Sequence, residues 1–204
     1  MAERYVITLG RECGAGATYI AQHLSKELGI PYYDKDIFRM VSDKSGVLEE
    51  FFHVNSERPG NNLLYKLVKD LKPADQKPSL GKDIVSPDNL FRFQSELIRE
   101  LADNESCIII GRCADYVLKD HDNCVHVFVC GDMDSKVQRM MHSYSLEESA
   151  AVERIKETDK QRKKYYSYYT GGDWESASNY DLCLNTGNMS IEEAAEQILF
   201  YLKQ

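Results

Sequence analysis

The sequence predicts one α/β domain, residues 1–204, built around a doubly wound sheet. Five apolar segments of strand length alternate with segments of helical periodicity, which is the order that such a sheet requires. Cys107 to Ile110 is apolar at every position, as expected for a parallel strand buried on both faces. With 204 residues and 43% hydrophobic content, the chain can bury one sizeable core. Its ligand is expected in the crevice at the carboxyl ends of the strands.

The first part of the chain predicts strand, helix and short strand in close succession. Apolar residues at helical spacing mark the first helix, and Gly29 is a natural C-terminal cap for it. Two short helices are expected next. The expected elements are a strand at Tyr5–Leu9, a helix at Ala17–Leu28, a strand at Ile30–Tyr33, and helices at Ile37–Ser42 and Val47–Phe52.

The region from about residue 53 to residue 87 differs in composition from the rest. It is polar and holds four of the chain's five prolines, which is typical of irregular structure. Leucine and valine at helical spacing predict one helix within it, from Leu63 to Leu71. We therefore expect an inserted flap or small lobe here.

The second part predicts three more strands and four helices. Ser86-Pro87-Asp88 and Ser190-Ile191-Glu192-Glu193 are helix starts, and Ser145-Leu146-Glu147-Glu148 has the form of a capping box. The glycine pair 171–172 would end the long polar helix that starts at Ser145. The expected elements are helices at 87–102, 133–142, 145–169 and from 190 onward, and strands at Cys107–Ile110, Val125–Val129 and Leu182–Leu184.

The net charge, the cysteine spacing and the length of the apolar runs argue against several classes of function. A net charge of -8 opposes general adsorption to nucleic acid or to an anionic membrane. The six cysteines form no C-x-x-C pair, and no apolar run is long enough to act as a signal core or to span a bilayer. We expect a cytoplasmic protein with reduced thiols and small-molecule ligands.

The stretch around which the chain is organised is the turn between the first strand and the first helix. Gly10, Gly14 and Gly16 lie there, and glycine lets backbone N–H groups point inward at the positive end of a helix dipole. Such a turn suits phosphate; a tight structural turn is the alternative. The candidate nucleotide-binding residues are Gly10, Arg11, Glu12, Cys13, Gly14, Ala15, Gly16, Ala17 and Thr18.

This turn matches the phosphate-loop pattern G-x-x-x-x-G-K-[ST] only in part. Gly16 and Thr18 fit, but Arg11 takes the first glycine position and Ala17 takes the lysine position. A methyl group cannot reach the β- and γ-phosphates, so another cation must do so or transfer is weak. Arg11, in the turn itself, is the candidate replacement, and a solvated surface arginine is the alternative.

Several segments together resemble the cytidylate kinase-like proteins, a group of nucleoside monophosphate kinases with a phosphate loop. The segments are G-R-E-C-G-A-G-A-T, L-G-I-P-Y-Y-D-K-D, I-I-I-G-R-C-A-D-Y-V-L, D-K-Q-R-K-K-Y-Y and Y-D-L-C-L-N-T-G-N-M-S-I-E-E-A. The resemblance covers nearly the whole chain. It implies a three-layer P-loop kinase fold with a five-stranded parallel sheet, ATP on the loop, Mg²⁺, an acceptor pocket bordered by residues 53–87, and a helical lid at 145–172.

The same resemblance supplies candidate site residues. Arg112, in the G-R pair after a strand, inherits a phosphate or acceptor role, although the acids expected beside it are replaced by Ile110 and Cys113. Arg162, in a D-x-x-R segment, resembles a lid arginine. The tyrosines that follow it could equally pack against a second subunit, as in a homodimer.

Carboxylates and a hydroxyl complete the expected site. Thr18 would bind Mg²⁺ through its hydroxyl, with a helix cap as a compatible role. Asp34 and Asp36 alternate at a strand's end, so both are expected in the crevice, one towards metal and one towards an acceptor hydroxyl, with turn or cap roles as the alternative. Asp115 is a further candidate for orienting the metal.

We therefore expect an ATP-dependent, Mg²⁺-requiring kinase whose acceptor is a nucleotide such as CMP or another small molecule. Ala17 and the absent acids favour a second reading, a nucleotide-binding module with a degenerate loop and little catalysis. A third is a protein-interaction scaffold that binds no nucleotide.

Overall fold

A computed structural model describes residues 4–57 and 86–203 and shows a five-stranded parallel sheet. The strand order is β2-β3-β1-β4-β5, and because all neighbouring strands are parallel, every connection between them is a crossover. This confirms the predicted α/β fold class. The strands are β1 (Val6–Arg11), β2 (Tyr32–Tyr33), β3 (Cys107–Ile110), β4 (Cys124–Cys130) and β5 (Leu182–Asn185).

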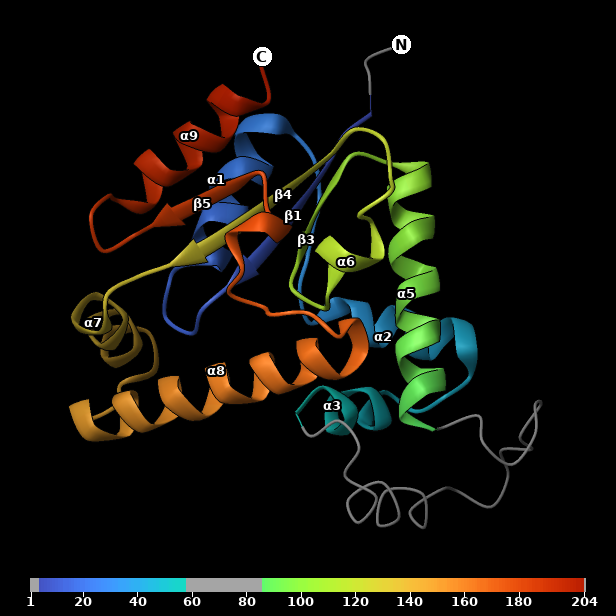
Figure 1. Ribbon diagram of the computed structural model, residues 1–204, viewed down its shortest axis with the longest axis horizontal. Coiled ribbons are helices and arrows are strands. Elements are labelled where there is room, and N and C mark those ends of the chain that lie inside the picture. Colours follow the sequence, from blue (N-terminus) through green and yellow to red (C-terminus); the bar gives the residue numbers. More distant parts are fainter. Residues whose placement is uncertain (1–3, 58–85, 204) are drawn as a thin grey trace.

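Helices cover both faces of the sheet (Figure 1). Those of the first half are α1 (Ala17–Leu28), α2 (Asp36–Ser45), α3 (Glu49–Glu57) and α5 (Pro87–Asn104). Those of the second half are α6 (Ala114–Val117), α7 (Met133–Tyr144), α8 (Glu148–Thr170) and α9 (Ile191–Tyr201), with a 3₁₀ turn at Ala177–Asn179. The predicted helix at Leu63–Leu71 lies outside the described residues.

Alternation along the central strand explains the two core layers. Ile7 and Leu9 of β1 pack with α1 and α9, whereas Val6 joins the cluster formed by α2, α3 and α5. In β3, Ile108 and Ile110 join the first layer and Ile109 the second. Because successive side chains of a strand point to opposite faces, an apolar run of this kind requires cover on both sides.

Helix ends follow local sequence rules with one exception. Helix α1 lies between Gly16 and Gly29, both in the left-handed region with φ of 89° and 67°, and α9 starts at the capping box of Ser190 and Glu193. The capping box predicted at Ser145 is wrong. Ser145 instead ends α7 with φ of 52°, and α8 begins after Glu147 without a side-chain cap.

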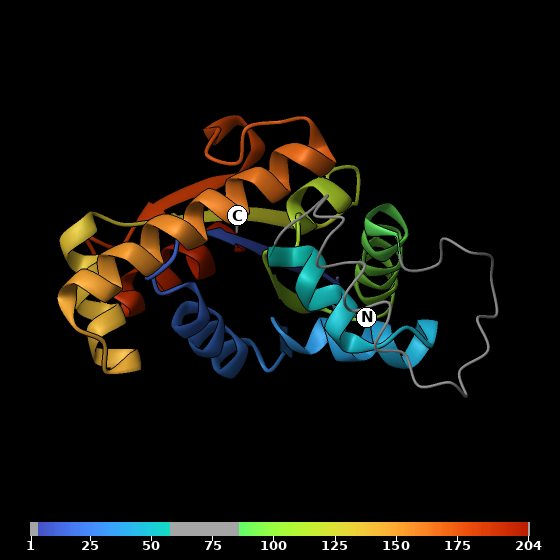
Figure 2. The ribbon, with the colours of Figure 1, turned by 90° about the horizontal axis from the view of Figure 1, so that it is seen from below.

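Helix α8 lies across the edge of the sheet where the strands end. Figures 1 and 2 show it running from α7 at one side towards α3 and α5 at the other. Its amino-terminal half packs through Ala151 and Ile155 on Cys13 and on α7. Its carboxyl-terminal half packs through Tyr165 and Tyr166 on Cys113 and Phe128. The helix therefore bridges the crevice in which a ligand is expected.

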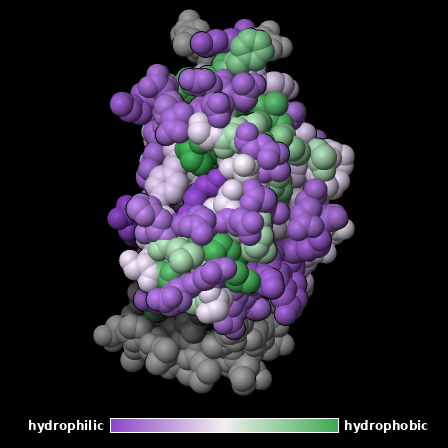
Figure 3. All heavy atoms as spheres, turned by 90° about the vertical axis from the view of Figure 1, so that its left-hand side faces the viewer, coloured by the Kyte–Doolittle hydropathy of each residue, from purple (hydrophilic) through white to green (hydrophobic). Residues whose placement is uncertain are grey.

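Among the helices of residues 4–57 and 86–203, none is long and apolar enough to cross a bilayer. Figure 3 shows the face at the left of Figure 1, where hydrophilic residues cover most of the surface and hydrophobic ones occur in small groups.

Candidate functional site: an arginine-lined cavity at the glycine loop

A cavity of about 680 Å³ opens at the carboxyl ends of β1 and β3. Its floor is the loop between β1 and α1, one wall is the segment from Gly111 to Asp115, and α8 closes it from above. Five arginines line it, namely Arg11, Arg112, Arg139, Arg154 and Arg162. Its position is the one that a doubly wound sheet provides for a ligand.

The loop requires glycine at two positions. Gly14 has φ of 79°, and a side chain there would lie 2.8 Å from the carbonyl oxygen of Lys136; Gly16 has φ of 89°, and a side chain there would overlap Ile191. Every candidate nucleotide-binding residue lines the cavity except Ala15. Ala15 is buried beneath it, where its carbonyl accepts a hydrogen bond of 2.8 Å from the hydroxyl of Thr186.

Arg11 ends β1 and reaches across the cavity floor. Its Nη2 lies 3.3 Å from Oδ1 of Asp34, and its side chain is 17% exposed. Burial lowers the pKa of the Arg11 guanidinium to about 9, and repulsion from Arg162 and Arg112 adds to the shift, while Asp34 opposes it. Arg11 is therefore a largely buried cation that pairs with Asp34.

Arg112 occupies the opposite wall. It follows Gly111 in a run of three left-handed residues, with φ of 70°, 61° and 53° at Gly111, Arg112 and Cys113. This backbone turns the Arg112 guanidinium onto the ring of Phe38, with its central carbon 3.8 Å from the ring centroid. Its Nε is buried without a hydrogen-bond partner among the described residues, and burial lowers its pKa.

Arg162 enters the same space from α8. Its Nη1 donates a 3.0 Å hydrogen bond to the carbonyl of Arg11. The neighbouring lysines do not follow it inward, because Lys160 pairs with Glu157 and Lys163 pairs with Glu175 at the surface. Among the basic residues of α8, Arg154 and Arg162 line the cavity, and Arg162 is the one that donates to the loop backbone.

The two aspartates expected side by side are separated. Asp34 lines the cavity, but Asp36 is exposed, 3.9 Å from Arg39, and is not brought to the cavity. The physical reason is that α2 begins at Asp36, so the alternation that would place both on one side ends between them. Thr18, at the start of α1, lines the same cavity as Asp34.

Asp115 is a buried carboxylate in the wall. Its Oδ2 accepts a 2.7 Å hydrogen bond from the hydroxyl of Tyr166, and burial raises its pKa. Tyr166 belongs to an aromatic cluster with Tyr165, Phe128 and Trp174, in which the rings of Phe128 and Trp174 have centroids 5.3 Å apart. Tyr165, Tyr166 and Trp174 also line the cavity.

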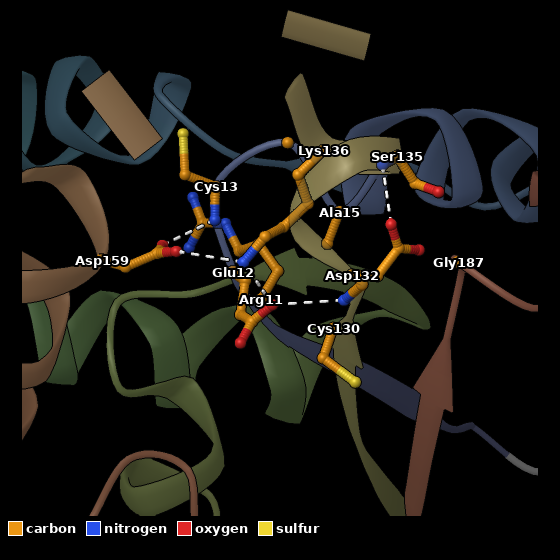
Figure 4. A network of polar contacts seen from close by, with 12 residues as sticks. Arg11, Glu12, Cys13, Ala15, Cys130, Asp132, Ser135, Lys136, Asp159 and Gly187 are labelled. Carbon is orange, nitrogen blue, oxygen red and sulfur yellow. Dashed lines mark hydrogen bonds and ion pairs between the residues drawn. The ribbon is translucent and has the colours of Figure 1, made fainter. Parts of the chain in front are cut away.

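Three side chains that sequence reasoning missed, Lys136, Arg139 and Asp159, hold the loop in place together with Glu12, which was predicted as a nucleotide-binding residue. Glu12, Lys136 and Asp159 form a network of charges beside Cys13 (Figure 4), and Arg139 donates to the carbonyl of Gly14 at 2.9 Å and to that of Thr186. The sequence indicated these contacts with the loop only indirectly. Asp159 is the first residue of the D-x-x-R segment, and Lys136 and Arg139 are three residues apart on one helix.

Together, the parallel sheet, the glycine loop capped by a helix and the cationic cavity define an α/β protein of the P-loop kinase fold. The model of the cytidylate kinase-like family matches residues 6–188. The chain therefore belongs to that family.

Curated relatives and solved structures agree with this. The chain is 23% identical to a cytidylate kinase of Sulfurisphaera tokodaii, covering 97% of this chain and 94% of that one, and 26% identical to one of Methanopyrus kandleri, covering 92% and 88%. A structure of an uncharacterized Eubacterium ventriosum protein matches at TM-score 0.73 and 26% identity, over 98% and 99%.

A more distant structure shows the fold alone. It is a shikimate kinase from Bacteroides thetaiotaomicron, with TM-score 0.55 and 14% identity over 98% and 99% of the two chains. The family is cytidylate kinase-like, and the fold is that of P-loop kinases.

Proposed function

We propose that this protein is an ATP-dependent, Mg²⁺-requiring phosphotransferase whose acceptor is a nucleoside monophosphate, with CMP as the first to test. The γ-phosphoryl group of ATP would pass to an oxygen of the acceptor phosphate, giving ADP and a nucleoside diphosphate. The family and the curated relatives support this class of reaction.

The observation that carries the proposal is the convergence of three guanidinium groups on one cavity, whose arginines outnumber its carboxylates. Asp34 pairs with Arg11, and Asp159 lies 3.7 Å from Arg162. The Nε of Arg112 has no partner among the described residues. Buried cations are stable only when they are paired. Phosphoryl transfer needs cations on the phosphate oxygens and little covalent chemistry from the protein, so two bound phosphates account for this excess of positive charge.

On the donor side, Arg11 would take the place of the missing loop lysine. It lies on the cavity floor, while Ala17 at the lysine position offers a methyl group. The N–H groups of the loop and the amino end of α1 suit the remaining phosphate oxygens. Thr18 and Asp34 supply oxygen ligands of the kind Mg²⁺ prefers, and the ion would neutralise phosphate charge when bound.

On the acceptor side, Arg112 is the group with unused capacity. Its Nε has no partner among the described residues, and stacking on Phe38 fixes the plane of the guanidinium. A planar guanidinium matches two oxygens of a phosphate. The rings of Trp174 and Tyr165, which line the cavity, suit a flat base.

The second candidate function is nucleotide binding with little turnover, and Ala17 is the observation that favours it. Loss of one preorganised donor costs on the order of 3 to 4 kcal/mol in a transition state. Such a loss leaves binding largely intact, so binding and transfer must be measured separately.

The deciding experiment combines calorimetry with a product assay. ATP with Mg²⁺ and CMP are each titrated into the protein, and CDP formation is followed by chromatography with UMP, AMP and shikimate as alternative acceptors. Binding of both ligands with CDP as the main product supports the proposal. Binding without product supports the second candidate, and no binding at millimolar ATP overturns both.

A further inference from the structure

One buried lysine joins the glycine loop to α8. Lys136 of α7 has a side chain only 8% exposed, and its Nζ lies 2.8 Å from Oε2 of Glu12 and 3.8 Å from Oδ2 of Asp159. Glu12 belongs to the loop and Asp159 to α8 (Figure 4). A buried ammonium group must stay paired, so this lysine fixes two carboxylates that come from separate segments.

Asp159 also binds the loop directly. Its Oδ1 accepts a hydrogen bond of 2.6 Å from the backbone N–H of Cys13 and lies 3.7 Å from Nη1 of Arg162. A single carboxylate therefore contacts the loop backbone, α7 and its own helix. Hydrogen bonds that involve a charged group are stronger than neutral ones, about 1.5 to 3 kcal/mol each.

The loop end of this arrangement is itself fixed. The same Oε2 of Glu12 accepts a hydrogen bond of 3.2 Å from the backbone N–H of Gly131. Glu12 and Lys136 are thus anchored to the end of β4 and to α7. Asp159 is the member that belongs to the helix closing the cavity.

Arg162 follows Asp159 by three residues, which places both on the inner side of α8. The outer side carries exposed pairs instead, such as Lys160 with Glu157, whose side chains are 62% and 59% exposed. Because α8 is rigid over one turn, the position of Asp159 on the loop determines where the Arg162 guanidinium lies.

We propose that Asp159 is a positioning residue, which holds α8 on the loop and thereby sets Arg162 over the phosphates. Glu12, Lys136 and Asp159 form what we name the loop–lid clamp. The role of Arg162 rests on the proposed function. The clamp itself is a property of the protein without ligand and is testable on its own.

The first test is a double-mutant cycle on turnover. Asp159→Asn keeps an acceptor for the Cys13 N–H but removes the charge, and we expect kcat to fall about tenfold, because one charged contact contributes about that factor, while the affinity for ATP stays within about twofold. In an Arg162→Ala background the same change should cost little, since Asp159 acts through Arg162. Glu157→Gln, on the outer side of the same helix, is the control and should match wild type.

Two outcomes would overturn the positioning role. One is equal loss from Asp159→Asn with and without Arg162, which would mean that the two side chains act independently. The other is a loss confined to the affinity for ATP.

The second test needs no activity. Hydrogen exchange of the ligand-free protein should show the Cys13 amide protected in wild type and in Glu157→Gln, and exchanging about tenfold faster in Asp159→Ala. Exchange at Ile108, in the buried sheet, serves as the reference for global stability. Unchanged protection at Cys13 would overturn the clamp, and this result stands whether or not any acceptor is phosphorylated.

Discussion

Arg11 and Gly111 depend on each other at the scale of single residues. The Arg11 guanidinium lies where a side chain at residue 111 would be, so a methyl group there would overlap it. Gly111 also has φ of 70°, a conformation that costs L-residues about 1 to 2 kcal/mol. The glycine therefore serves both the turn after β3 and the space for a cation.

We expect Arg11→Ala to weaken ATP binding by about ten- to a hundredfold, the range that corresponds to a lost charged hydrogen bond. Calorimetry with ATP and Mg²⁺ measures this, and Arg92→Ala is the control because Arg92 is 57% exposed and pairs with Glu96 on the surface. Adding Ala17→Lys to the Arg11 variant should recover part of the affinity. Equal affinity in Arg11→Ala and wild type would reduce Arg11 to a structural partner of Asp34.

We expect Gly111→Ala to reproduce much of the Arg11→Ala effect on ATP while keeping the arginine. The matched control is Gly29→Ala, because Gly29 has a similar φ of 67° but open space where the methyl group would lie. Both variants should lose about 1 kcal/mol of stability in urea unfolding. Only Gly111→Ala should lose ATP affinity, and a similar loss in both would trace the effect to the backbone alone.

At the scale of elements, α8 has one side for the cavity and one for solvent. Arg162 and Tyr165 line the cavity, while Lys163 pairs with Glu175 and Asp173 outside. From the sequence, the lysines of this helix could equally contact phosphate or form a solvated face. Pairing with nearby carboxylates offsets the repulsion among the lysines, so no bound anion is needed to explain them.

Nucleotide should tighten this helix further. Hydrogen exchange over residues 150–172 should slow on addition of ATP and Mg²⁺, and Arg162→Ala should lower kcat more than it lowers ATP affinity. Lys163→Ala, half-exposed on the same helix, is the control and should change neither. An exchange pattern indifferent to nucleotide would leave α8 as a fixed structural helix.

The bounds of a helix or strand could be predicted where residues close in the sequence determine them. The bounds of α1 and β3 were predicted correctly because glycine caps and an apolar run determine them. Ser145 was misjudged, since Ser and Glu at capping-box spacing also occur after a left-handed helix end. The short helix α6 was missed because it depends on left-handed φ angles at Arg112 and Cys113. Arginine and cysteine rarely adopt such angles, so their presence does not predict them.

At the scale of the whole molecule, the site proved harder to predict than the fold. Alternating apolar segments determine which layers form, but Asp159 and Cys13 are 146 residues apart in sequence and meet only because α8 crosses the sheet's edge. Arg112 was expected in the crevice from its place after β3, and it lines the cavity. The stacking of Arg112 on Phe38 depends on the position of α2, and no sequence pattern connects α2 to Arg112.

Stability should depend on pH through a histidine in the central sheet. His126 of β4 has its Nδ1 2.8 Å from the hydroxyl of the buried Thr8, and burial lowers its pKa. A histidine in the unfolded chain has a pKa of about 6.5, and below that pH the unfolded chain binds more protons than the native one. The contribution of His126 to the free energy of unfolding is therefore present above that pH and is lost as the pH falls below it.

The measurement is urea unfolding at pH 7.5 and 5.5 for wild type and His126→Asn, which keeps a polar atom near the position of Nδ1. The variant should lose less stability between the two pH values than wild type does. Parallel losses in the two proteins would assign the acid sensitivity to other groups.

The cavity also contains the chain's single tryptophan. Trp174 is buried against Phe128 just beyond the end of α8 and borders the cavity. Its emission therefore comes from one known place, so we expect a ligand that enters the cavity, or a movement of α8 that exposes the indole to water, to change this one optical signal. Stopped-flow fluorescence without a dye would then follow occupancy of the cavity at low protein concentration.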